Sequence, residues 1–239
     1  MKTQPSSRKR GFTLAETVIA IGVLAVLLTG FIIVFAPAAA GIKKSVNLQA
    51  ADRLSSTLEQ ELVTWRTGNP GTTGFDKAFE WIKSSNAGTN TDNALLVYQY
   101  RGSLTTTRAD GTPEPVATIA NKVPGTDYIV QSMVRRNNDD LFESDLTAIE
   151  GSVYLVKCTQ FVFDTDGKLV LGTPGQIADP KNSATVVATA DLYPEAVIAF
   201  SAEFYSLPQK SAAYFGSSFA DTYAKVKNPV FTRNLAARR

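Results

Sequence analysis

The sequence predicts an α+β fold: a long N-terminal helix, transmembrane at first and then amphipathic, followed by a mainly antiparallel β-sheet domain. Between residues 12 and 42 the only charged residue is Glu16, so this segment is long and apolar. Apolar side chains then recur every fourth residue over 46–62, which is the spacing of one helix face. After residue 94, β-branched and aromatic segments alternate with turn residues, a pattern typical of strands. A helix followed by a run of strands indicates the α+β class.

The apolar segment is long enough to cross a membrane. Residues 17–36 alone supply about 20 mostly apolar positions, which as a helix span a hydrocarbon core of about 30 Å. Arg8, Lys9 and Arg10 precede the segment, and this positive charge would hold the N-terminal end in the cytoplasm. An unpaired carboxylate inside such a segment costs several kcal/mol, so the presence of Glu16 requires an explanation.

Two ordinary interpretations account for part of this segment. A signal anchor explains the basic flank and the apolar run but leaves Glu16 unexplained. A cleaved secretory signal gains support from "FAPAAAG" at 35–41, because its alanines fit the small-x-small cleavage pattern. Secretory signals, however, have apolar regions of roughly 7–15 residues, and this run is much longer.

A third interpretation rests on the stretch "RKRGFTLAE", residues 8–16, and the apolar run after it. The stretch resembles the class III leader and N-terminal helix of type IV pilins and type II secretion pseudopilins. In that family a basic leader ends in glycine, here Gly11, and is followed by Phe-Thr-Leu and a glutamate. Glu16 is the fifth residue after the junction between Gly11 and Phe12. The resemblance covers only the N-terminal part of the chain.

The resemblance implies how this segment would be processed. A prepilin peptidase in the inner membrane would remove the leader after Gly11 and methylate the new amino terminus at Phe12. Glu16 would pair with the positive terminus of a neighbouring subunit. One feature departs from the family: many pilins carry a proline within the apolar run, and this chain has none before Pro37.

The implied organisation is pilin-like. The expected parts are a prepilin leader at 1–11, a transmembrane and polymerisation helix at 12–42, an amphipathic stalk helix at 43–66 and an extracytoplasmic α+β domain at 67–239. The stalk is expected to end near Trp65 or Arg66. Sequence alone leaves open whether one helix runs through or a break at 37–41 separates two helices.

The resemblance implies a structural subunit, a minor pilin or minor pseudopilin, of a type IV pilus or type II secretion pseudopilus. Its partners would be prepilin peptidase, other pilin or pseudopilin subunits and the inner membrane. Removing residues 1–11 from the 239-residue chain would leave 228 residues, which is long for a major subunit. The competing interpretation is a single-pass inner-membrane-anchored binding domain or enzyme that does not polymerise.

The domain after the stalk is expected to begin with a short helix and continue with strands. The segment 75–85 predicts a helix that packs Phe75, Phe79 and Ile82. Strands are expected at 94–102, 127–135, 152–164 and 196–207, with a hairpin turn at Asp166-Gly167 and polar loops at 102–126 and 172–192. Aromatic residues gather after residue 200 and are expected to pack in the core or between subunits. The basic tail "RNLAARR", residues 233–239, is expected to fray.

Composition excludes several kinds of chemistry. The 239 residues include no histidine and one cysteine, Cys158, which excludes an intrachain disulfide, a Cys/His zinc site and a Ser/His/Asp triad. Cys158 has apolar neighbours and is expected to be a buried small hydrophobic residue. Outside residues 1–11, which carry four of the 24 Lys and Arg, 20 basic residues stand against 22 acidic ones. A nearly neutral body gives no electrostatic basis for nucleic-acid binding.

Two acidic stretches contain carboxylates that could bind a metal ion. "DTDGK", residues 164–168, lacks the spacing of an EF-hand loop and is better explained by turn formation. Asp139, Asp140, Glu143 and Asp145 lie close together in the sequence and are expected to form a solvated loop. The sequence therefore predicts no catalytic residue, no cofactor and no metal, and the chain is not expected to be an enzyme.

Overall fold

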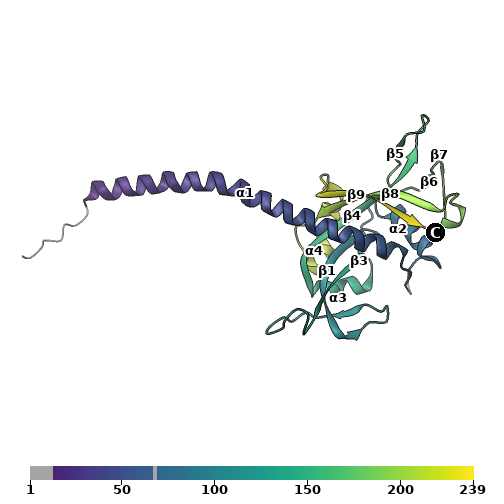
Figure 1. The fold of residues 1–239 in the computed structure, drawn as a ribbon, viewed down its shortest axis with the longest axis horizontal. Coiled ribbons are helices and arrows are strands. Elements are labelled where there is room, and N and C mark those ends of the chain that lie inside the picture. Colours follow the sequence, from purple (N-terminus) through teal and green to yellow (C-terminus); the bar gives the residue numbers. More distant parts are fainter. Residues whose placement is uncertain (1–12, 67–68) are drawn as a thin grey trace, which may run out of the picture. The chain divides into compact units, whose positions relative to one another are not determined.

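The structure of the protein is a computed structural model that describes residues 13–66 and 69–239 (Figure 1). The chain divides into two compact units, Met1–Val46 and Asn47–Arg239. One α-helix, α1, passes through the boundary between them.

Helix α1 comprises Leu14–Val63, 50 residues, and includes Pro37 within its length. Of the two alternatives left open by the sequence, the structure has the continuous helix. Proline removes one backbone N–H from the helical ladder but does not end the helix here. The helix stops at Val63, slightly before the predicted end at Trp65 or Arg66. Among the described residues, α1 is the one helix whose length and composition suit a membrane crossing.

The second unit is built on an antiparallel sheet of seven strands, which confirms the predicted α+β class. The strands run in the order β2-β1-β4-β8-β9, with β3 paired to β1 and β5 paired to β4. Their bounds are Leu95–Thr107 (β1), Pro113–Pro115 (β2), Ile129–Arg136 (β3), Ile149–Phe163 (β4), Leu169–Leu171 (β5), Val197–Ser206 (β8) and Phe231–Arg238 (β9). A separate pair consists of β6, Ala178–Asp179, and β7, Asn182–Val186.

The four predicted strands and the hairpin are present, but the two polar loops are shorter than predicted. Strand β1 continues to Thr107 and β2 follows, so the segment 102–126 is only partly a loop. The segment 172–192 contains β6, β7 and a short 3₁₀ helix, Ala190–Leu192. At the β4–β5 turn, Asp164 Oδ1 accepts hydrogen bonds from the backbone N–H groups of Asp166 and Lys168. This confirms the turn interpretation of "DTDGK".

The C-terminal tail does not fray, and that prediction was wrong. Phe231–Arg238 forms β9, which pairs with β8 along its whole length. Leu235 and Ala237 are buried, whereas the residues on either side of them are more exposed. Buried and exposed side chains therefore alternate, as in a strand with one face in the core, although the segment also contains basic residues. The Arg239 guanidinium donates to the Ala190 carbonyl at 2.6 Å and lies 4.7 Å from the Phe75 ring centroid. The tail is therefore part of the sheet and of its packing.

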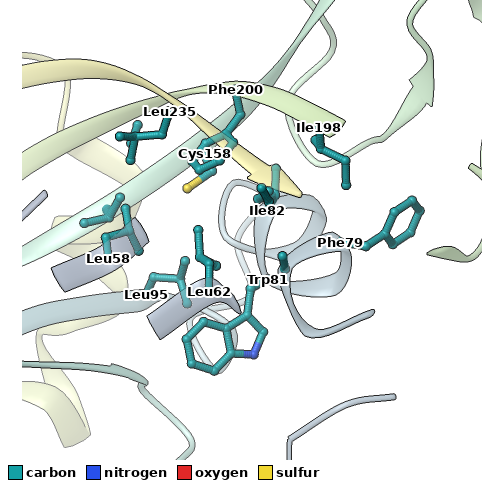
Figure 2. Packing of buried hydrophobic residues seen from close by; sticks show 14 of the residues in the cluster. Leu58, Leu62, Phe79, Trp81, Ile82, Leu95, Cys158, Ile198, Phe200 and Leu235 are labelled. Atoms are coloured by element: carbon teal, nitrogen blue, oxygen red, sulfur yellow. The ribbon is translucent and has the colours of Figure 1, made fainter. Parts of the chain in front are cut away.

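Alternating side chains of the sheet supply two hydrophobic clusters on its opposite faces. In β1, Leu95 and Val97 belong to one cluster, whereas Leu96, Tyr98 and Tyr100 belong to the other. The first cluster is completed by the C-terminal part of α1 and by α2, Gly74–Ser84, with Leu58, Leu62, Phe79, Ile82, Cys158 and Phe200 among its members (Figure 2). The second is completed by α3, Asp140–Leu146, α4, Ala212–Ser217, and α5, Phe219–Lys225.

Several burial predictions are confirmed by these clusters. The α2 residues Phe75, Phe79 and Ile82 are at most 4% exposed. Cys158 is 1% exposed, and burial raises the pKa of its thiol to about 12, so the thiolate is scarce at neutral pH. Most of the C-terminal aromatic residues are buried, as in the case of Phe219.

Lys77 links α2 to the C-terminal end of α1 by hydrogen bonds and an ion pair. Its side chain is completely buried, and its ammonium donates to Glu61 Oε1 at 2.6 Å and to the backbone carbonyls of Glu61 and Thr64 at 2.7 Å. The Glu61 carbonyl lies in the last turn of α1, where it also accepts from the Thr64 backbone N–H, and Thr64 directly follows the helix. Burial lowers the pKa of Lys77, and the carboxylate of Glu61 opposes that effect. The ammonium therefore caps α1 and ties the two helices together.

Gly74 allows the close approach of these two helices, and Gly74→Ala is expected to destabilise the fold. An added Cβ would lie 2.2 Å from the Val63 carbonyl oxygen, so backbone must shift. We expect the free energy of unfolding to fall by about 1–3 kcal/mol. Denaturant titration of the full chain in detergent micelles, followed by tryptophan fluorescence, measures this change.

Gly216→Ala in α4 is the matched control. Apart from the chain neighbours and backbone of its own helix, no atom lies within 4 Å of its added Cβ, and alanine is the better helix former, so stability should stay equal or rise by up to about 1 kcal/mol. Equal stability of the Gly74→Ala variant and the native chain would contradict the proposed close packing.

Candidate processing and assembly segment

The described part of the N-terminal segment begins with a capping box. Thr13 precedes the first residue of α1, and its Oγ1 accepts a hydrogen bond from the Glu16 backbone N–H at 3.3 Å. In return, Glu16 Oε2 accepts from the Thr13 backbone N–H at 2.8 Å and from the Thr13 hydroxyl at 2.9 Å. Two N–H groups that a helix start leaves unpaired are thereby satisfied.

The capping box leaves part of the Glu16 carboxylate available. Both of its hydrogen bonds use Oε2, and among the described residues no donor is bonded to Oε1. Thr13 was not singled out by the sequence interpretation, although the spacing T-x-x-E before an apolar run is a known signature of a helix start. The site is therefore a pair of residues in which Thr13 orients the carboxylate of Glu16.

Apart from Glu16, the surface of α1 between Leu14 and Ile42 is apolar on every side. Large hydrophobic side chains from Leu14 to Ile42 are more than half exposed in the single chain. The hydroxyls of Thr17 and Thr29 donate to the carbonyls of Thr13 and Ala25, so these polar groups are satisfied within the helix. A helix that is hydrophobic all round requires lipid or other apolar helices around it. The segment thus suits both a membrane and a helical bundle.

Of the site residues predicted from the sequence, the structure places only Glu16. Arg8, Lys9 and Arg10 of the leader and the junction residues Gly11 and Phe12 lie outside the described residues. Their roles remain predictions from the sequence pattern.

The acidic stretch near residue 140 is not a solvated loop, and that prediction was wrong. Asp139 caps α3 by accepting from the Leu141 backbone N–H, while Asp140 and Glu143 are exposed. Asp145 is completely buried in the same helix. The acidic stretch alone does not predict this burial, because the partners of Asp145 come from β1, from β3 and from Arg108, which directly follows β1.

The partners of Asp145 are two arginines and a tyrosine. Its carboxylate accepts from the Tyr98 hydroxyl at 2.5 Å, the Arg108 guanidinium at 2.6 Å and Arg135 Nε at 2.9 Å. Burial, together with this carboxylate, raises the pKa of Tyr98 well above its ordinary value. The carboxylate is thereby engaged in a structural network. Among the residues that the structure describes, no group of three or more potential ligands is arranged around a metal position.

The comparison with protein families agrees with the sequence at this end of the chain. Residues 6–32 match the family model described as the prokaryotic N-terminal methylation motif. No curated protein and no solved structure matches the chain. The matched residues include the basic cluster, the Gly11-Phe12 junction and Glu16. The chain therefore carries the prepilin-type cleavage and methylation motif of type IV pilins and pseudopilins.

Proposed function

We propose that the chain is a structural subunit, a minor pilin or minor pseudopilin, of a type IV pilus or a type II secretion pseudopilus. The observation that carries this proposal is the match of residues 6–32 to the methylation motif. The apolar helix that follows supports it, because such a helix suits first the inner membrane and then the interior of a filament.

In this proposal the chain has four parts. Residues 1–11 are the leader, 12–42 cross the membrane and polymerise, 43–66 form the stalk and 67–239 form the extracytoplasmic domain. The helical part of the stalk ends at Val63. Prepilin peptidase would cut between Gly11 and Phe12, and the product would assemble with other pilin or pseudopilin subunits.

The proposed assembly step is an ion pair between Glu16 and the methylated amino terminus of a neighbouring subunit. Thr13 holds Glu16 Oε2, which leaves Oε1 to accept from the incoming ammonium. A buried carboxylate with a cation is far less costly in an apolar surrounding than a carboxylate alone. The partner charge exists at Phe12 only after processing, so cleavage would control assembly.

The length of the chain and the absence of a disulfide at its C-terminal end support the role of a minor subunit. The chain would keep 228 of its 239 residues after cleavage, and its single cysteine is buried, so no disulfide closes a C-terminal loop. Pairing of β9 with β8 fixes the C-terminal segment instead.

Mass spectrometry of the protein isolated from membranes tests the proposal. We expect a mature N-terminus at Phe12 that carries one methyl group. Gly11→Val is the control and should keep the leader and Met1, because the residue before the cut is changed. An intact Met1 in the native chain would favour a non-polymerising anchored domain, and a start at Gly41 would favour a secreted one. Either result would contradict the proposed function.

A further inference from the structure

The second unit contains a polar cavity of about 430 Å³. It is lined by residues that follow α1, by α2, by the turn between β1 and β2, by the end of β3 and by the start of α3. Three arginines and three aspartates take part in the lining: Arg66, Arg135, Arg136, Asp110, Asp139 and Asp140. Only those charged groups that have no partner within the chain are available to bind a ligand.

Two of the three arginines are bonded to groups of the chain itself. Arg135 forms ion pairs with Asp110, Asp139 and Asp145 at 2.9–3.1 Å. Arg66 pairs with Glu61 and donates to the Asp110 carbonyl. These arginines hold the walls of the cavity together and have little capacity left for a ligand.

Two further donors in the lining are the Trp81 indole N–H and Arg136. Trp81 is 4% exposed, and neither its Nε1 nor the buried Nε of Arg136 has an acceptor within the described part of the chain. The Arg136 guanidinium carbon lies 5.9 Å from the Trp81 ring centroid, so the two residues are neighbours in the lining. Figure 2 shows the indole at the edge of the hydrophobic cluster, with its nitrogen facing away from Leu95. Buried donors without acceptors are unfavourable, and a ligand oxygen would satisfy both.

Charge in the lining restricts the ligand. Burial lowers the pKa of Arg136, an effect that Glu80 opposes, so an additional negative group nearby would be favourable. The aspartates that line the same cavity would repel a doubly charged phosphate more strongly than a singly charged group. A planar carboxylate offers two acceptor oxygens with a single charge.

We propose that this cavity binds a carboxylate, whose oxygens accept hydrogen bonds from Trp81 Nε1 and Arg136 Nε. The carboxylate has two sources with the same chemistry, a small organic acid or the terminal or side-chain carboxylate of a polypeptide. The proposal does not depend on cleavage or on polymerisation.

NMR of the full chain in detergent micelles, with ¹⁵N-labelled tryptophan, tests the proposal. The chain has two tryptophans, so two indole signals are expected, and a Trp81→Phe variant identifies the signal of Trp81. The probes are acetate, inorganic phosphate, and the peptide acetyl-Gly-Gly-Gly with a free or an amidated C-terminus. We expect carboxylates to move the Trp81 indole proton downfield in a saturable manner. Trp65, which already donates to the Gly71 carbonyl, should not respond.

Arg136→Gln should weaken acetate binding about tenfold, since a charged hydrogen bond is lost. Lys168→Gln removes an exposed positive charge from the β4–β5 turn and should leave the affinity unchanged. Equal binding of acetate and the free-carboxylate peptide would indicate a small acid. Tighter binding of that peptide, lost on amidation, would indicate a polypeptide. Absence of any saturable shift, an unchanged affinity in Arg136→Gln or tighter binding of phosphate than of acetate would overturn the proposal.

Discussion

Glu16→Ala is expected to leave cleavage after Gly11 intact and to reduce incorporation of the subunit into filaments about a hundredfold or more. The reason is electrostatic. Without the carboxylate, the ammonium at Phe12 of a neighbouring subunit would be buried among apolar helices with no counter-charge, and an uncompensated buried charge costs about 3–5 kcal/mol. The fraction of subunit in sheared filaments relative to membranes, measured by immunoblot, gives the effect. Mass spectrometry of the same samples reports cleavage.

Two further variants separate the charge of Glu16 from its role as a helix cap. Glu16→Gln keeps an oxygen that can accept from Thr13 but removes the charge, so it should assemble nearly as poorly as Glu16→Ala. Thr13→Val removes the capping hydroxyl and keeps the charge; it should weaken the helix start by only about 0.5–2 kcal/mol and lower assembly less. Normal assembly of Glu16→Gln would show that the carboxylate serves the cap and does not pair between subunits.

The features that could be predicted from the sequence depend on neighbours along the chain. The apolar run, the α2 helix and the β4–β5 turn are each specified within a short segment, and each is present. The capping box of Thr13 and Glu16 was equally local, and its T-x-x-E spacing was available in the sequence.

The features that were missed depend on partners far away in the sequence. The basic residues of "RNLAARR" suggested a frayed end, whereas the buried Leu235 and Ala237 place that segment beside β8. The sequence predicts Asp145 in solvent with its acidic neighbours, because no local pattern shows that Arg108 and Arg135 contact it. Trp81 and Arg136 likewise come from α2 and β3, and their shared cavity follows only from the fold. Contacts of this kind are decided by tertiary packing.

Asp145→Ala is the substitution with the largest expected effect on stability. The carboxylate is completely buried and joins α3 to β3 through Arg135, to β1 through Tyr98, and to Arg108 just after β1. Removal of one partner from a buried ionic network costs about 3–5 kcal/mol, because the remaining charges stay buried with fewer partners. Denaturant titration of the full chain in micelles should show a fall of that size in the free energy of unfolding.

Comparison with milder variants shows whether charge or shape produces this loss. Tyr98→Phe removes one hydroxyl but leaves both arginines on Asp145, so it should cost only about 1–3 kcal/mol. Glu143→Gln changes an exposed carboxylate of the same helix and should stay within about 0.5 kcal/mol of the native chain. Equal losses for Asp145→Ala and Tyr98→Phe would mean that the arginines find other acceptors. Asp110 and Asp139 already bind Arg135, whereas Arg108 has its only ion pair among the described residues with Asp145. Arg108 is therefore the group whose burial makes the loss of Asp145 costly.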